Sequence, residues 1–183
     1  VTAEDGTRQA YSVTVQKITT VASGYQALVL ASGPVSYWPL NEFSGTTAMD
    51  IVGVNNAEYG RTYTLGQPGL RIGVGTSVEF NGGEATAPYS DSLNPAHFTV
   101  ECWVKPINTT VQYLVSLQDR TAGGRIGYAL WKNNGSVGFG IMAGTGTGNN
   151  GVAVNGATAA EAGKTYHVVG TYNGTTLKLY VNG

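Results

Sequence analysis

Residues 98–106, FTVECWVKP, constrain the fold of this chain more than any other stretch. Apolar side chains recur at every second position from Phe98 to Val104, and this period of two sends successive side chains to opposite faces of a sheet. The intervening face carries Glu101 but also Trp103, which indicates cover on both faces, as in a sandwich. Pro106 cannot donate to the hydrogen-bond ladder and ends the run. The stretch therefore predicts an inner strand.

Other short alternating runs repeat this pattern between Gly and Asn turns. They predict strands at residues 35–40, 77–81, 85–88, 112–118, 125–132, 136–143, 164–172 and 177–181. Asn173-Gly174 predicts a hairpin between the last two, and Gly82-Gly83 a turn between 77–81 and 85–88. Residues 41–59 and 144–151 are predicted loops. A single short helix is expected within residues 21–33, with Ser23 as its N-cap. The pattern is typical of an all-β, antiparallel sandwich.

The composition excludes several classes of partner. Only 11% of the residues are charged, against about 25% in a typical soluble protein, and the formal net charge is −1. No basic run offers a footprint for nucleic acid. No apolar run reaches the ~18 residues that a membrane span needs, so we expect no membrane insertion. Cys102, the single cysteine, is predicted to be a small buried hydrophobe.

The first twenty residues form a separate pattern. Tyr11, Val13 and Val15 alternate with polar residues after the turn pair Asp5-Gly6, which predicts a hairpin. The phrase resembles the last two strands of bacterial cadherin-like, immunoglobulin-like repeats. We therefore predict the terminal hairpin of a preceding β-sandwich at residues 1–20 and a main domain at residues 21–183. The alternative is an N-terminal strand of the main domain.

Four stretches of the main domain resemble a known family. Residues 37–53, 77–83, 98–106 and 162–183 are similar in order and spacing to the bacterial laminin G-like domains, which are concanavalin A-like jelly rolls. The resemblance implies two curved antiparallel sheets in a non-catalytic module of a secreted or cell-surface protein, covalently linked to neighbouring domains. Relatives bind glycans or protein partners. Members continue past the final turn of this sequence, so we expect the domain to be incomplete at its C-terminus.

Glycan binding requires aromatic rings that stack on sugar C–H groups and planar polar groups that fix hydroxyls. Such residues gather in the predicted middle strands and their loops. The candidates for ligand binding are Tyr113, Arg120, Arg125, Tyr128, Trp131 and Asn133. Packing in the core is the alternative for each aromatic residue.

Calcium is the one metal that the sequence favours. Glu42 and Asp50 flank a loop rich in hard oxygen ligands, which is the ligand type that calcium takes. Several members of the laminin G-like family hold a structural calcium ion near such a loop. The alternative is a turn capped by Asp50 without a metal.

The sequence is compatible with three functions. The first is a non-catalytic, extracellular recognition module that binds carbohydrate, and the second is a structural or protein-binding adhesive spacer. The third, a fragment of a glycoside hydrolase, needs two carboxylates about 5 to 10 Å apart in one cleft. No predicted strand carries acidic residues two or four positions apart, so we expect no catalysis by this chain. It can still be an accessory module of an enzyme.

Overall fold

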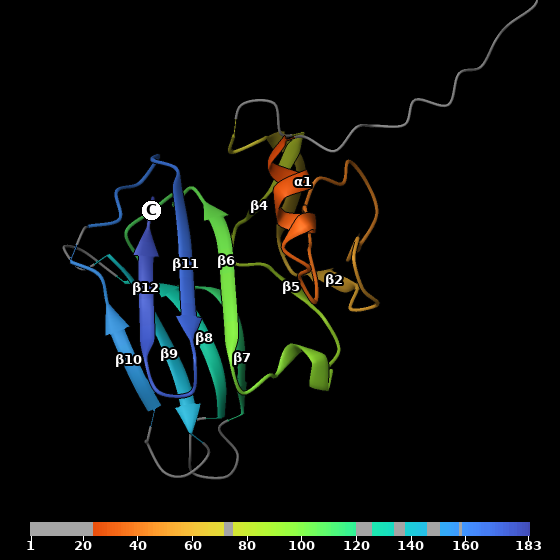
Figure 1. Ribbon diagram of the computed structural model, residues 1–183. Helices are drawn as coiled ribbons and strands as arrows, with labels where there is room; N and C mark the ends of the chain where they lie inside the picture. The colour runs from red at the N-terminus through yellow and green to blue at the C-terminus, as the bar shows by residue number, and fades with distance from the viewer. Residues whose placement is uncertain (1–23, 72–74, 120–125, 134–137, 146–150, 158) are drawn as a thin grey trace, which may run out of the picture. The chain divides into compact units, whose positions relative to one another are not determined.

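The computed structural model describes residues 24–71, 75–119, 126–133, 138–145, 151–157 and 159–183 (Figure 1). By its internal contacts the chain divides into two compact units, Val1–Ser32 and Gly33–Gly183. The hairpin predicted at residues 1–20 lies outside the described residues. That hairpin and the domain boundary after residue 20 therefore stay predictions.

One short helix, α1 (Gly24–Ala31), confirms the helix expected in this region. None of its residues is buried, and Leu28 is 72% exposed. The chain leaves the helix at Gly33, which adopts a left-handed backbone conformation (φ 66°) that costs glycine little. Predicted Ser23 lies outside the described residues.

Two antiparallel sheets form the main sandwich, as predicted. The three-stranded sheet has the order β12-β11-β6 and the four-stranded sheet the order β10-β9-β8-β7. Their strands are β6 (Phe98–Val104), β7 (Gln112–Asp119), β8 (Ile126–Lys132), β9 (Phe139–Thr145), β10 (Gly151–Asn155), β11 (Tyr166–Tyr172) and β12 (Leu177–Val181). Figure 1 shows the three-stranded sheet in front of the four-stranded one.

The core lies between these sheets. Phe98, Val100, Cys102 and Val104 pack against it, which confirms the predicted inner face of β6. Phe139 from β9 meets Tyr166 from β11 edge-on, with 5.1 Å between ring centroids. Burial, with a smaller contribution from the nearby Glu101 charge, raises the pKa of the Cys102 thiol to about 12, so this cysteine is un-ionised.

The outer face of the three-stranded sheet carries a polar and aromatic cluster at one end. The rings of Trp103 and His167 stack with 4.7 Å between centroids, and the Arg71 guanidinium lies 4.9 Å from the Trp103 ring. Glu101 Oε2 lies 3.4 Å from His167 Nε2. Glu101 thus has a partner on the neighbouring strand of the sheet.

A second group of short strands lies earlier in the chain. The order in one sheet is β1-β2-β5, and β3 pairs with β4 in another. The bounds are β1 (Thr47–Ala48), β2 (Ala57–Gly60), β3 (Tyr63–Pro68), β4 (Thr76–Phe80) and β5 (Glu84–Thr86), followed by a 3-10 turn at Asp91–Leu93. Tyr59 stacks on Tyr63 with 4.9 Å between centroids in a separate apolar cluster.

The strand predicted at residues 35–40 is wrong. The Tyr37 N–H donates to Asp50 Oδ1 at 2.9 Å, and the Tyr37 carbonyl accepts the Ile51 N–H at 3.0 Å. Pro39 has no N–H to offer, and Leu40 has a positive φ of 53°. This segment is irregular because the backbone N–H and carbonyl groups of Tyr37 form hydrogen bonds with a loop rather than with a neighbouring strand.

The hairpin predicted across Gly82-Gly83 is also wrong. β4 confirms the strand at 77–81, but it pairs with β3, while β5 pairs with β2. A Cβ at Gly83 would lie 2.8 Å from the carbonyl oxygen of Gly60 and closer still to that of Thr62. The chain therefore passes between two sheets at a point where only glycine fits. The sequence reading also missed β1, β2, β3 and β10.

Gly170 sets the approach of the two main sheets. It lies on the inner face of β11, where an added Cβ would collide with the Cδ1 methyl of Ile141 from β9. We expect Gly170→Ala to lower the free energy of unfolding by about 1–3 kcal/mol through overpacking, measured by urea denaturation.

The double variant Gly170→Ala, Ile141→Val removes the colliding methyl and is the matched control. Ile141→Val alone should cost about 0.5–1.5 kcal/mol. We expect the double variant to be more stable than the sum of the two single effects predicts. Simple additivity would show that the Ile141 contact is not the cause.

Candidate binding surfaces

The structure brings three of the predicted ligand-binding residues together on the outer face of the four-stranded sheet. Tyr113 of β7 lies directly opposite Trp131 of β8 in the strand register. Leu130, next to Trp131, belongs to the core, so Trp131 is on the outward side. Tyr113 is 57% exposed and Trp131 is partly exposed.

Trp131 is held in place by its neighbours. A Cβ at Gly140 would collide with the indole ring, so the ring lies over the Gly140 backbone. The indole Nε1–H donates to Asn133 Oδ1 at 2.9 Å, and Asn133 Nδ2 donates to Asn155 Oδ1 at 3.1 Å. We call Tyr113, Trp131, Asn133 and Asn155 the tryptophan patch. Asn155 was not a sequence candidate, because β10 was not predicted.

Tyr128, a fourth candidate, does not join this patch. The Tyr128 ring lies 4.7 Å from the Phe98 ring, and its hydroxyl donates to the Leu93 carbonyl at 3.1 Å. Burial raises the pKa of Tyr128. Tyr128 is on the inward side of β8, because it lies an odd number of residues from Trp131. Arg120 and Arg125 lie outside the described residues.

Asp50, a predicted calcium ligand, is buried and accepts hydrogen bonds from several backbone N–H groups around its loop. Its Oδ1 accepts the N–H groups of Tyr37 at 2.9 Å and Val52 at 3.1 Å, and its Oδ2 accepts that of Asn55 at 3.2 Å. Burial alone would raise the pKa of Asp50. The hydrogen bonds from backbone N–H groups and from the Ser36 hydroxyl outweigh that effect and hold the pKa below its ordinary value.

Glu42, the second predicted calcium ligand, is engaged in the same way. Its Oε1 accepts the Met49 N–H at 2.9 Å and its Oε2 accepts the Tyr59 hydroxyl at 2.6 Å. All four carboxylate oxygens of Glu42 and Asp50 thus face hydrogen-bond donors. In the described ranges, no three Asp, Glu, His or Cys side chains gather as a metal site would require. These residues fit a hydrogen-bonded loop better than a cation site.

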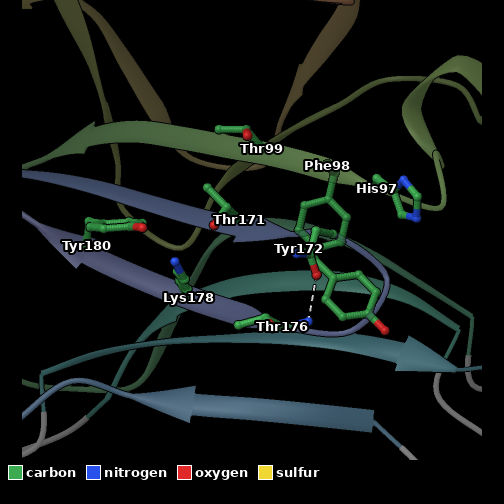
Figure 2. Close-up of a pocket in the computed structure, with 9 residues that line it drawn as sticks. His97, Phe98, Thr99, Thr171, Tyr172, Thr176, Lys178 and Tyr180 are labelled. Carbon is green, nitrogen blue, oxygen red and sulfur yellow. Dashed lines mark hydrogen bonds between the residues drawn. The ribbon is translucent and has the colours of Figure 1, made fainter.

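A groove of about 410 Å³ lies on the outer face of the three-stranded sheet (Figure 2). Its polar side chains come from β6, β11, β12 and the turns beside them. They include His97, Thr99, Thr171, Thr176, Lys178 and Tyr180. Phe98, Tyr172 and Asn173 complete the lining, and we call this surface the threonine groove. The sequence reading missed it. The signal available in the sequence was the set of polar side chains among the alternating positions of β11 and β12, which indicates an outward face.

Several acidic residues of the described segments have partners other than a second carboxylate. Glu58 accepts from the Thr47 hydroxyl at 2.9 Å, Glu84 lies 3.4 Å from Arg61, and Glu161 lies 2.7 Å from Lys164. Glu101 is near His167, as described above. None of these pairings has the two-carboxylate arrangement of a glycoside hydrolase.

Comparison with protein families supports the fold. A family model described as the concanavalin A-like lectin/glucanases superfamily matches residues 80–183, more than half of the chain. The chain therefore belongs to this superfamily, in its laminin G-like group. The matched region contains both main sheets, the tryptophan patch and the threonine groove. Comparisons with curated proteins and with solved structures gave no significant match.

Asp50→Asn should destabilise the protein by about 1–3 kcal/mol at neutral pH, because an amide NH₂ would face backbone donors in a buried site. The folded pKa of Asp50 is depressed. Its contribution is therefore present above the ordinary carboxyl pKa of about 3.9 and is lost as the pH falls through the folded value. Urea denaturation across this acidic range should show a weaker pH dependence in the variant.

Asp91→Asn is the matched control. Asp91 is exposed, and its carboxylate accepts a hydrogen bond from the Tyr89 hydroxyl, which an amide oxygen can also accept. We expect little change in its unfolding free energy. Equal losses in the two variants would contradict the role assigned to Asp50.

Proposed function

We propose that this domain is a non-catalytic carbohydrate-recognition module that binds a glycan at the tryptophan patch. The observation that carries the proposal is the Trp131 ring, fixed over Gly140 beside two side-chain amides. Membership of a lectin and glucanase superfamily supports the same class of ligand.

The patch has the chemistry that a sugar requires. One apolar face of a pyranose can lie against the Trp131 ring, with Tyr113 directly across the strand pair. The amides of Asn133 and Asn155 already bond each other, and their remaining donor and acceptor sites can fix sugar hydroxyls. Because the Trp131 side chain is held before binding, little rotamer entropy is lost when a ligand binds.

Absence of catalysis is part of the proposal. Laminin G-like domains are generally non-catalytic modules, and the acidic residues described above pair with donors rather than with each other. We place the module in an extracellular or cell-surface protein with covalently linked neighbours, as is usual for such domains. No helix in the described part of the chain is long and apolar enough to cross a membrane.

A second candidate function is protein binding by an adhesive spacer. The loop that contains β1 exposes several apolar side chains, and Phe43 and Val54 are 78% and 92% exposed. Exposed apolar groups of this kind mark protein-binding surfaces when they are contiguous. This surface involves different residues from the tryptophan patch, so substitutions can separate the two functions.

Structural calcium at Glu42 and Asp50 stays a prediction. A calcium ion would have to displace the N–H and hydroxyl donors that now face their oxygens. Calcium binding would appear as a rise in melting temperature with CaCl₂ that is absent in Asp50→Asn. An unchanged melting temperature in wild type would contradict the calcium prediction.

Trp131→Ala should abolish most glycan binding by this domain. A glycan array would first identify a neutral oligosaccharide that the wild-type protein binds. For that oligosaccharide we expect Trp131→Ala to lose at least tenfold in affinity, measured by isothermal titration calorimetry. Trp131→Phe retains a ring and should give an intermediate affinity.

Tyr89→Ala is the matched control, because Tyr89 is a 67% exposed aromatic residue outside the patch. It should bind as wild type does. Thermal melting of each variant separates loss of binding from loss of folding. If Trp131→Ala binds the glycan with wild-type affinity, the tryptophan patch is not the binding site. If the wild-type protein binds no glycan on the array, carbohydrate recognition itself is contradicted.

A further inference from the structure

The register of the three-stranded sheet aligns polar side chains across the floor of the threonine groove. Thr171 lies opposite Thr99 on one side and opposite Lys178 on the other. Lys178 falls between Leu177 and Leu179, which pack on the core, so its side chain is on the outward face. Threonine is restricted in χ1, so its hydroxyl has few positions available on the floor. Figure 2 shows this row across the three strands.

The walls of the groove come from an aromatic ring and a turn. Tyr180 is 42% exposed and lies two residues from Lys178, hence on the same face of β12. At the other end, Asn173 Oδ1 accepts the N–H groups of Thr175 and Thr176 at 3.0 and 2.7 Å, which fixes the turn. The His97 imidazole packs over Gly174 of this turn.

The charge of the groove is one-sided. Lys178 is exposed, and no Asp or Glu lines the groove. The nearest carboxylate in the register is Glu101, which shares the row of Tyr180 with Val169 between them, and it lies beside His167. In the described segments the Lys178 ammonium has no ion pair. A ligand that enters the groove therefore meets a cation, an imidazole and the hydroxyl groups of threonine and tyrosine side chains.

We propose that the threonine groove is a second saccharide site, specific for an anionic sugar unit with a carboxylate, such as a hexuronate. This inference rests on the proposed carbohydrate recognition for the class of ligand, but it uses a different sheet and different residues. The carboxylate binds the Lys178 ammonium, and the sugar hydroxyls bond Thr99 and Thr171. The Tyr180 ring covers an apolar face of the pyranose. The volume of about 410 Å³ lies within the range of small-ligand sites.

The test uses the full chain with trigalacturonate, and with the fully methyl-esterified trimer as an uncharged probe of nearly the same shape. Titration calorimetry should show binding of the acid at least tenfold tighter than of the ester. The difference should shrink as salt rises, because the groove is open to solvent.

Lys178→Ala should reduce the affinity for trigalacturonate at least tenfold, while Lys178→Arg retains most of it. Lys105→Ala, which removes the same charge beyond the far end of β6, should bind as wild type does. Trp131→Ala should also retain trigalacturonate binding, because its ring belongs to the other sheet.

The outcomes separate this inference from the proposed function. Equal affinity of wild type for acid and ester, or unchanged binding in Lys178→Ala, overturns the groove as an anionic site. Loss of trigalacturonate binding in Trp131→Ala but not in Lys178→Ala assigns that ligand to the tryptophan patch and also overturns it. Binding that depends on Lys178 alone supports the groove even if neutral glycans fail to bind the tryptophan patch.

Discussion

The close packing of the two main sheets is the constraint on which the rest of the structure depends. β6, β9 and β11 fill the space between the sheets with Phe98, Phe139 and Val168, and Gly170 lets Ile141 reach the opposite backbone. Interiors of this density leave no room for an added methyl group. Because the inner faces are committed to the core, the alternation of each strand decides which side chains remain for ligands.

Both candidate surfaces are consequences of that division. Lys178 is outward because its neighbours Leu177 and Leu179 are inward, and Trp131 is outward because Leu130 is inward. The tryptophan patch and the threonine groove therefore lie on the outer faces of different sheets. A polymer that carries both neutral and acidic sugars can be engaged at two places on one domain, which raises avidity when its length spans them.

Hydrogen bonds to a buried carboxylate, rather than packing between two sheets alone, stabilise the segment before the main sandwich. Its loop is held by Asp50, a carboxylate that gathers backbone N–H groups, as well as by the Tyr59 and Tyr63 stack. A metal ion and a set of N–H donors can both neutralise such a carboxylate, so Glu42 and Asp50 carry the same sequence signal in either case. In the structure, N–H and hydroxyl donors face these oxygens, and calcium at this loop stays a prediction.

The sequence by itself determined β6, its inner face and the β11–β12 hairpin, because strand alternation and Asn-Gly turns are local properties. It also pointed to Tyr113, Trp131 and Asn133 as polar and aromatic candidates. Only the tertiary structure decided that Tyr128 is interior, that Asn155 joins Trp131, and that β4 pairs with β3 rather than β5. These outcomes depend on which strands become neighbours, and strand pairing is settled by contacts between residues far apart in the chain.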